Sequence, residues 1–185
     1  MSTNRTSPPQ VYEPEVEEGF EWALPLDGKH ALLFGGFDGT PRAGAWSPVP
    51  MYLLRSDEGG PRRRADLPWL GSHVLILRDE AIAEVGPILA DHGELLPLEC
   101  ADAGLVVLNV TRVVDALDEE RSDIVRFSSG RIMDIKKATF RGELLTGPAV
   151  FKIPQMPFGP LYFTSDTVEL IRATGRHRGV TFRPA

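Results

Sequence analysis

The feature that most restricts how this chain can fold is a pattern that occurs twice, at residues 73–99 and 160–184. Each segment reads as a short apolar strand, a polar residue that can cap a helix, a helical run, a glycine that ends the helix, and a further strand. When LILRDEAI is placed over LYFTSDTV, Leu75 aligns with Leu161. Either an internal duplication or convergence on common helix-start chemistry explains this likeness.

The first helical run is expected to begin after Asp79, which is placed to cap it. Ile82, Val85 and Leu89 fall on one face at helical spacing, so this face should pack against the core. Pro87 lacks an amide hydrogen and its ring crowds the preceding turn. The helix is therefore predicted to bend or split at Gly86-Pro87.

The second helical run follows the strand PLYF, with Ser165 or Asp166 as its cap. Val168 and Ile171 supply its apolar face, and Gly175 is expected to stop it. Short apolar or β-branched runs elsewhere predict strands, and 18 glycines and 16 prolines imply many turns. These strand runs are ALLFGG, VPMYLLR, ELLPLEC, GLVVLNV, IVRF, RIMDIKKATF and AVFKIP.

Strands and helices do not alternate regularly here, as they would in a doubly wound fold. We therefore predict an α+β protein, in which a mixed or antiparallel sheet carries two short capped helices and many turns. Residues 1–10 are expected to be a disordered lead-in. Residues 11–70 are expected to form strands and loops, either as an edge strand or arm or as part of the same core, and residues 71–185 form the main α+β domain.

Charge is distributed unevenly along the 185 residues. Residues 1–120 have a formal charge of −12 and residues 121–185 one of +6, which gives the net charge of −6. The two parts either neutralise each other within one folded domain or leave an acidic surface open to a basic partner. Binding of nucleic acid by the chain itself is disfavoured by the negative net charge.

Residues that could do chemistry are scattered. His30, His73, His92 and His177 do not form a metal-ligand spacing, and Cys100 is the single cysteine, which excludes an internal disulfide. We expect no metal and no cofactor. No run approaches the roughly 18 apolar residues of a membrane span, and a reducing, cytoplasmic location fits this composition best.

The stretch LVVLNVTRVVDALDEERSD changes from apolar to densely acidic within one segment. Its carboxylates Asp115, Asp118, Glu119 and Glu120 lack the alternating ligands and central glycine of a calcium loop. They are explained by a strand that ends in a solvated turn, by a surface that binds a partner, or by catalytic carboxylates. Sequence alone does not decide between these three interpretations.

Several segments, in this order, resemble a family of bacterial immunity proteins: HGELLPLE, LNVTRVVDALDEERS, RIMDI, LTGPAVFKIP and LYFTSDTVELIRATGRHRGVTFRP. This is the eleventh-numbered immunity family of polymorphic toxin systems, formerly described as a domain of unknown function. Its characteristic segments correspond here to residues 93–98, 109–118, 151–153 and 179–184. The resemblance covers roughly residues 70–185, about two-thirds of the chain.

The resemblance implies a cytoplasmic antidote, made beside a toxin, that binds this toxin and has no catalytic residues of its own. A basic nuclease-type toxin would suit the acidic first 120 residues. Under this hypothesis the acids would imitate phosphates and aromatic side chains would anchor the toxin. The residues expected at the contact are Asp115, Asp118, Glu119, Glu120, Trp22, Trp46 and Trp69, although burial in the core is the favoured interpretation of each tryptophan. The alternatives are a small enzyme that uses carboxylates and His92, or a binding module unrelated to toxins.

Overall fold

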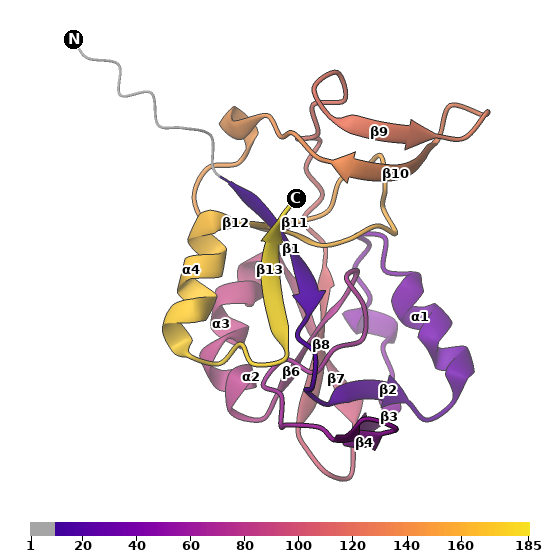
Figure 1. Cartoon of the computed structure of the whole chain (residues 1–185), viewed down its shortest axis with the longest axis vertical. Helices are drawn as coiled ribbons and strands as arrows, with labels where there is room; N and C mark the ends of the chain where they lie inside the picture. The colour runs from indigo at the N-terminus through magenta and orange to yellow at the C-terminus, as the bar shows by residue number, and fades with distance from the viewer. Residues whose placement is uncertain (1–9) are drawn as a thin grey trace.

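The computed structural model describes residues 10–185 and arranges them in two larger β-sheets that share a hydrophobic core (Figure 1). Mixed and antiparallel sheets with a few short helices confirm the predicted α+β class. The predicted lead-in at residues 1–10 lies, apart from Gln10, outside the described residues.

The larger sheet has five strands, and strand pairing within it is mixed. Their order is β2 (Trp22–Pro25), β3 (Val49–Leu54), β7 (Gly93–Glu99), β8 (Leu105–Val110) and β6 (Leu75–Arg78). β3 and β7 run parallel, and all other neighbours in this sheet run antiparallel. Four of its five strands, β3, β6, β7 and β8, lie where apolar runs of the sequence predict them.

The second sheet has four antiparallel strands in the order β11 (Val150–Phe151), β12 (Tyr162–Thr164), β1 (Val11–Val16) and β13 (Val180–Pro184). β1 is hydrogen-bonded to β12 on one side and to β13 on the other. The interpretation of its sequence as an edge strand or arm is therefore wrong. Its partners come from the far end of the chain, where no local signal points back to it.

Two further strand pairs are small hairpins: β4 (Ser56–Asp57) with β5 (Gly60–Pro61), and β9 (Asp123–Arg126) with β10 (Ile132–Lys137). The β9–β10 hairpin lies across one end of the molecule, at the top of Figure 1. Short 3-10 segments complete the described structure: η1 (Gly28–His30), η2 (Ala43–Ala45), η3 (Ala90–His92) and η4 (Gly142–Leu144).

The α-helices are α1 (Ala31–Gly35), α2 (Glu80–Glu84), α3 (Gly86–Leu89) and α4 (Ser165–Thr174). The split between α2 and α3 confirms the bend predicted at Gly86-Pro87. α1 replaces a predicted strand at ALLFGG, because a short apolar run fits either type of element. Within residues 10–185 the helices are too short or too polar to cross a membrane.

Helix α4 begins at Ser165, one of the two residues predicted to cap it. Thr164 occupies the N-cap position instead, and neither Ser165 nor Asp166 caps the helix. The Thr164 hydroxyl does not accept a hydrogen bond from an amide of the helix; it accepts one from the amide of Ala149 at 2.9 Å and lies 3.2 Å from the hydroxyl of Thr167. Gly175, at φ 70°, ends α4 in the left-handed conformation as predicted.

The two repeated segments of the sequence build the same local topology. In the first, β6 and β7 are connected through α2 and α3 and both pair antiparallel with β8, which lies between them. In the second, β12 and β13 are connected through α4 and both pair antiparallel with β1. Each unit is thus a pair of parallel strands divided by an inserted strand. An internal duplication stays a prediction.

Three hydrophobic clusters fill the molecule, and strand alternation distributes side chains among them. Leu75 and Leu77 point into the main cluster between the two sheets and helices α2–α4, whereas Ile76 points to a second cluster beside α1. Val150 likewise faces the main cluster and Phe151 faces a third one, next to the β9–β10 hairpin. Residues 11–70 contribute strands to both larger sheets.

Candidate partner-binding surface

A groove lies between the β9–β10 hairpin and the loop at residues 155–159. It has a volume of about 530 Å³, and its walls come from residues 130–132 of the hairpin, from the whole 155–159 loop, and from Glu119 and Arg126. We refer to this loop as the groove loop. The groove is therefore built by three segments of residues 119–159, at one end of the molecule.

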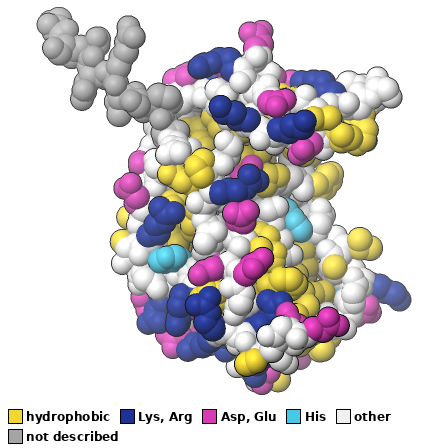
Figure 2. All heavy atoms as spheres, viewed as in Figure 1, with side chains coloured by type: hydrophobic (Ala, Val, Ile, Leu, Met, Phe, Trp, Pro, Cys, Tyr) yellow, Lys and Arg dark blue, Asp and Glu magenta, His cyan; other side chains and the backbone are white. Residues whose placement is uncertain are grey.

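Apolar side chains meet solvent around this groove. Phe158, at the tip of the groove loop, is 60% exposed, and Phe127 and Met133 of the hairpin are exposed as well. The guanidinium of Arg131 lies 5.9 Å from the centre of the Phe127 ring. Figure 2 shows hydrophobic side chains near a hollow in the outline, on the side where Figure 1 places the hairpin above α1. Exposed aromatic groups of this kind are typical of surfaces that bind a partner.

The sequence explains why these groups stay exposed. Phe158 lies in PQMPFGP, whose prolines cannot donate to a β-ladder, so this segment forms a turn rather than a strand. The amide of Gly159 closes the turn by donating to the carbonyl of Met156 at 2.9 Å. The hairpin packs one side, with Ile124 and Ile135, on the third cluster and leaves Phe127 outside.

Of the four predicted acids, Glu119 lies in the groove wall. Its carboxylate is 2.6 Å from Nη2 of Arg126, which also lines the groove. Asp115 is exposed and lies outside the groove lining, where it pairs with Arg141 at 3.2 Å. It also accepts a hydrogen bond from Gln155, so it contacts the base of the groove loop.

Asp118 and Glu120 complete the acidic turn. Asp118 is half-buried, accepts a hydrogen bond from the Arg121 amide at 3.2 Å and lies 4.0 Å from the guanidinium of the same residue. Glu120 is exposed to solvent. The turn therefore carries both signs of charge, because three of its four acids have arginine partners that follow them in the chain.

The same neutralisation occurs across the whole molecule. In the part of the chain that the structure describes, seven ion pairs join carboxylates of residues 10–120 to arginines of residues 121–185. The acidic first part and the basic last part of the chain thus largely neutralise each other within one folded unit. This favours the first of the two interpretations of the charge distribution over an open acidic surface. These pairs still leave the net charge at −6.

The three tryptophans lie away from the groove, and all are half-buried. Trp22 lies beneath the guanidinium of Arg62, 4.5 Å from its ring centre, and Trp69 packs against the main cluster. Trp46 donates its indole hydrogen to the carbonyl of Pro97 at 2.8 Å. Of the three, Trp46 lines a second, smaller hollow of about 370 Å³ beside α1.

Two polar residues in the segments that resemble the immunity family meet inside the protein. Asn109 donates from Nδ2 to the Glu94 carboxylate and to the carbonyl of Thr40, both at 2.9 Å. Glu94 also accepts from the amides of Arg42 and Ala43. Burial raises the pKa of Glu94, but these hydrogen bonds outweigh burial and lower it. Glu94 and Asn109 therefore hold residues 40–43 against the five-stranded sheet.

The histidine proposed for an enzyme does not line the groove or the second hollow. His92 is buried, and its Nδ1 lies 3.5 Å from the guanidinium of Arg112. Burial and the charge of Arg112 lower the His92 pKa. Neither the groove nor the second hollow is lined by a histidine or by Cys100. In residues 10–185, groups of three or more potential metal-binding side chains do not occur.

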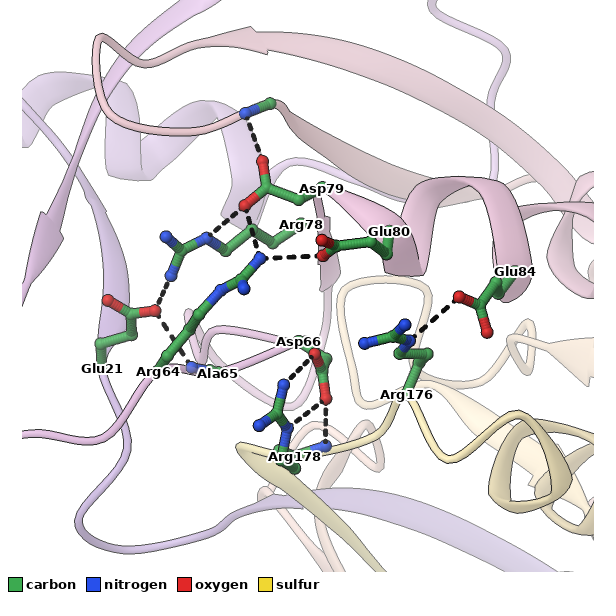
Figure 3. A network of polar contacts seen from close by, with 11 residues as sticks. Glu21, Arg64, Ala65, Asp66, Arg78, Asp79, Glu80, Glu84, Arg176 and Arg178 are labelled. Atoms are coloured by element: carbon green, nitrogen blue, oxygen red, sulfur yellow. Dashed lines mark hydrogen bonds and ion pairs between the residues drawn. The ribbon is translucent and has the colours of Figure 1, made fainter.

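A network of charged side chains, with Glu21, Asp66 and Arg78 buried, lies around the end of β6 and outside the groove lining (Figure 3). Glu21 forms an ion pair with Arg78, and the two residues are 2% and 7% exposed. The same Glu21 oxygen accepts a hydrogen bond from the amide of Ala65 at 3.0 Å. Nearby, Arg178 makes two hydrogen bonds to Asp66, at 2.6 and 2.8 Å. This network connects β2, β6 and the segments at residues 64–66 and 176–178.

Asp79 belongs to this network. It occupies the N-cap position of α2 as predicted, but its side chain does not bond to the helix. Its backbone has φ 48° and ψ −115°, a conformation that residues other than glycine rarely adopt. Its carboxylate accepts from the Gly104 amide and from Arg78 and Arg64, all at 2.9 Å. Although burial opposes them, these contacts lower the Asp79 pKa. The carboxylate is thus fully engaged, and its role is to fix the turn from β6 into α2.

The groove combines an exposed aromatic group, an acid predicted from the sequence and charges of both signs. No family model matches the chain, and a search of curated proteins found no match. The chemistry of the partner is therefore inferred from the groove and from the sequence segments described above.

Proposed function

We propose that this protein is a cytoplasmic immunity protein, which binds a cognate bacterial toxin one to one and blocks it, and that the groove is the centre of the contact. The observation that carries this proposal is the groove itself, with exposed Phe158 and Phe127 beside an apolar hollow. A stable inhibitor contact needs roughly 800 Å² from each partner. The groove, the hairpin and the acidic turn together form a continuous surface for this contact.

The arrangement of charges supports recognition of a protein. Protein contacts commonly have an apolar centre and a polar rim that excludes water and sets orientation. Here Arg126 and Glu119 pair within the groove wall, and Arg131 lies beside them. A toxin could place an aliphatic or aromatic side chain in the groove. Charged residues around that side chain would then pair with Arg126 and Glu119 at the groove wall. The net charge of −6 favours a basic partner, such as a nuclease domain, by speeding encounter.

The sequence segments that resemble the immunity family supply the biological role. Parts of two segments, residues 115–118 and 151–153, lie next to the groove or in the strand that leads to its loop. Others, including Glu94 and Asn109, act inside the protein. The resemblance therefore supports the proposed antidote, and the exposed aromatic group of the groove supports this surface as its contact.

Survival of a bacterial host tests this function directly. The C-terminal region of the protein encoded by the adjacent large open reading frame is expressed in a naive host, with and without this protein. We expect killing by this region, reversal of killing by this protein, and a one-to-one complex that co-purifies. Killing that persists despite co-expression would reject the antidote. A complex with a harmless region would favour a binding module unrelated to toxins.

Phe158→Asp tests the place of the contact. Placing a carboxylate at the tip of the groove loop should weaken toxin binding about 100-fold, because an exposed aromatic anchor is lost and a charge is buried in its place. Calorimetry of the purified pair measures this change. Leu170→Asp on α4 is the matched control, since Leu170 is also exposed but lies away from the groove. Equal affinities of the two variants would place the contact elsewhere.

A further inference from the structure

Lys152 is a buried cation at the root of the groove loop. Its side chain is 0% exposed, although lysine is seldom fully buried. Strand alternation accounts for its direction, because Lys152 follows β11 and points to the same side as Val150, toward the interior. Its backbone is fixed as well: the Lys152 amide donates to the carbonyl of Arg112 and its carbonyl accepts from the amide of Val114, both at 2.9 Å.

The ammonium group is satisfied by the groove loop. Nζ donates to the carbonyls of Pro157 at 3.1 Å and Gly159 at 3.3 Å, and these two residues lie on either side of Phe158. Burying an ammonium without hydrogen-bond partners is strongly unfavourable. The Lys152 side chain can therefore stay buried only while it keeps these two contacts. The same contacts restrain the loop, because moving either carbonyl away would leave the buried cation without that partner.

The groove loop has few other restraints of its own. It is not part of a helix or a strand, and its local backbone hydrogen bonds run from Met156 to Ile153 and from Gly159 to Met156. Phe158 itself is exposed and does not anchor the loop. A loop of this type usually moves unless side chains tie it down.

We infer that Lys152 positions the groove loop, and with it Phe158, so that the binding groove is formed before a partner arrives. This inference rests on the proposed function where it concerns the toxin, but the contact between Lys152 and the loop stands without it. A preformed loop strengthens binding, because it removes the entropy cost of ordering the loop in the complex.

The charges around Lys152 make its contact with the loop measurable. Burial lowers the pKa of Lys152 to about 8, and the opposing effect of the Asp38 carboxylate is smaller. His73, whose pKa is lowered by burial and by the Lys152 charge, titrates on the acid side of 6.5. The Asp38 pKa is lowered by hydrogen bonds from Thr40, so this carboxylate stays ionised above neutral pH. Arg112 lies in the segment that pairs with Lys152.

Amide NMR of the full chain between pH 7 and pH 9.5 is the first test. The amide signals of Phe158 and Gly159 should shift with a midpoint near pH 8, as the ammonium beneath them loses its proton. In Lys152→Met, which keeps an unbranched side chain of similar length, this titration should disappear. Lys29→Met is the control, because Lys29 is exposed and lies in η1, and it should leave the titration unchanged.

Hydrogen exchange and toxin affinity give the second test. Lys152→Met should raise the hydrogen-exchange rate of the groove-loop amides about tenfold, because the loop loses its hydrogen bonds from the charged Nζ. Exchange in the five-stranded sheet should stay unchanged, since those hydrogen bonds reach only the loop. Affinity for the adjacent toxin region should fall by a similar factor. Loop signals that ignore pH in the wild-type protein would overturn the inference, whatever the toxin does. If the loop signals respond to pH and to Lys152→Met but the substitution leaves toxin affinity unchanged, Lys152 still anchors the loop. The groove is then rejected as the toxin contact.

Discussion

Replacing Glu21 by Gln should lower the free energy of unfolding by about 3 kcal/mol. The substitution preserves shape but removes one of the two carboxylates that pair with the buried guanidinium of Arg78. Because the Asp79 carboxylate stays, 2.9 Å from Arg78 Nε, the expected loss lies at the lower end of the roughly 3–5 kcal/mol that breaking a buried ion pair typically costs. Arg78 is 7% exposed and cannot move into solvent without disturbing β6. The other partners of Glu21, the Ala65 amide and the Arg55 guanidinium at 3.6 Å, would also lose a charged acceptor. Urea denaturation followed by circular dichroism measures the loss.

A matched surface pair provides the control for this prediction. Glu13 pairs with Arg183 at 3.1 Å, but that guanidinium is largely exposed, so Glu13→Gln should cost less than about 1 kcal/mol. The double variant Glu21→Gln with Arg78→Met should recover part of the loss, because the buried charge is then removed as well. Similar costs at Glu21 and Glu13 would show that the network in Figure 3 contributes little to stability.

Gly93→Ala should destabilise the protein by about 3 kcal/mol or more. A Cβ atom at Gly93 would lie 2.2 Å from the carbonyl oxygen of Asn109 and 2.8 Å from Cα of Val110. Both atoms belong to the backbone of β8, which pairs with β7 along its whole length. Strands at this spacing can accept the methyl group only by moving apart, and overpacking against the backbone is among the more costly core changes.

Thermal or urea unfolding of Gly93→Ala is compared with that of Gly28→Ala. A Cβ at Gly28, the first residue of η1, would meet no atom within 4 Å. The control substitution should therefore change stability by less than about 0.5 kcal/mol. If Gly93→Ala is equally neutral, β7 and β8 have more freedom at this end than their pairing indicates, and the glycine of the GELLPL segment is explained by something other than packing.

Local sequence signals predict the parts of the fold that depend on neighbours in the chain. The bend at Pro87, the end of α4 at Gly175, and strands β7 and β8 follow from residue chemistry within a few positions. The position of β1 and the role of Asp79 do not, because their partners are distant in sequence. Asp79 has a good capping side chain, but arginines and a distant amide occupy its carboxylate.

The candidate site shows the same division. The acidic turn at residues 115–120 is evident from the sequence, but its arginine partners depend on the way the hairpin folds back over it. Phe158 is absent from the predicted contact residues because an aromatic side chain between prolines can be buried or exposed. The three tryptophans were predicted at the contact instead. Trp69 is held by packing, Trp46 by a hydrogen bond and Trp22 by an arginine.

Strand β1 is synthesised well before its two neighbours, and this separation determines the order in which the molecule assembles. All strands of the five-stranded sheet lie within residues 22–110, so that sheet can pair while the rest of the chain is still being made. β1 must wait, with both edges unpaired, for β12 and β13. Contacts between segments so far apart in sequence form slowly. Completion of the four-stranded sheet is therefore a late step, and chains released before residue 162 expose an open strand that is prone to pair with other chains.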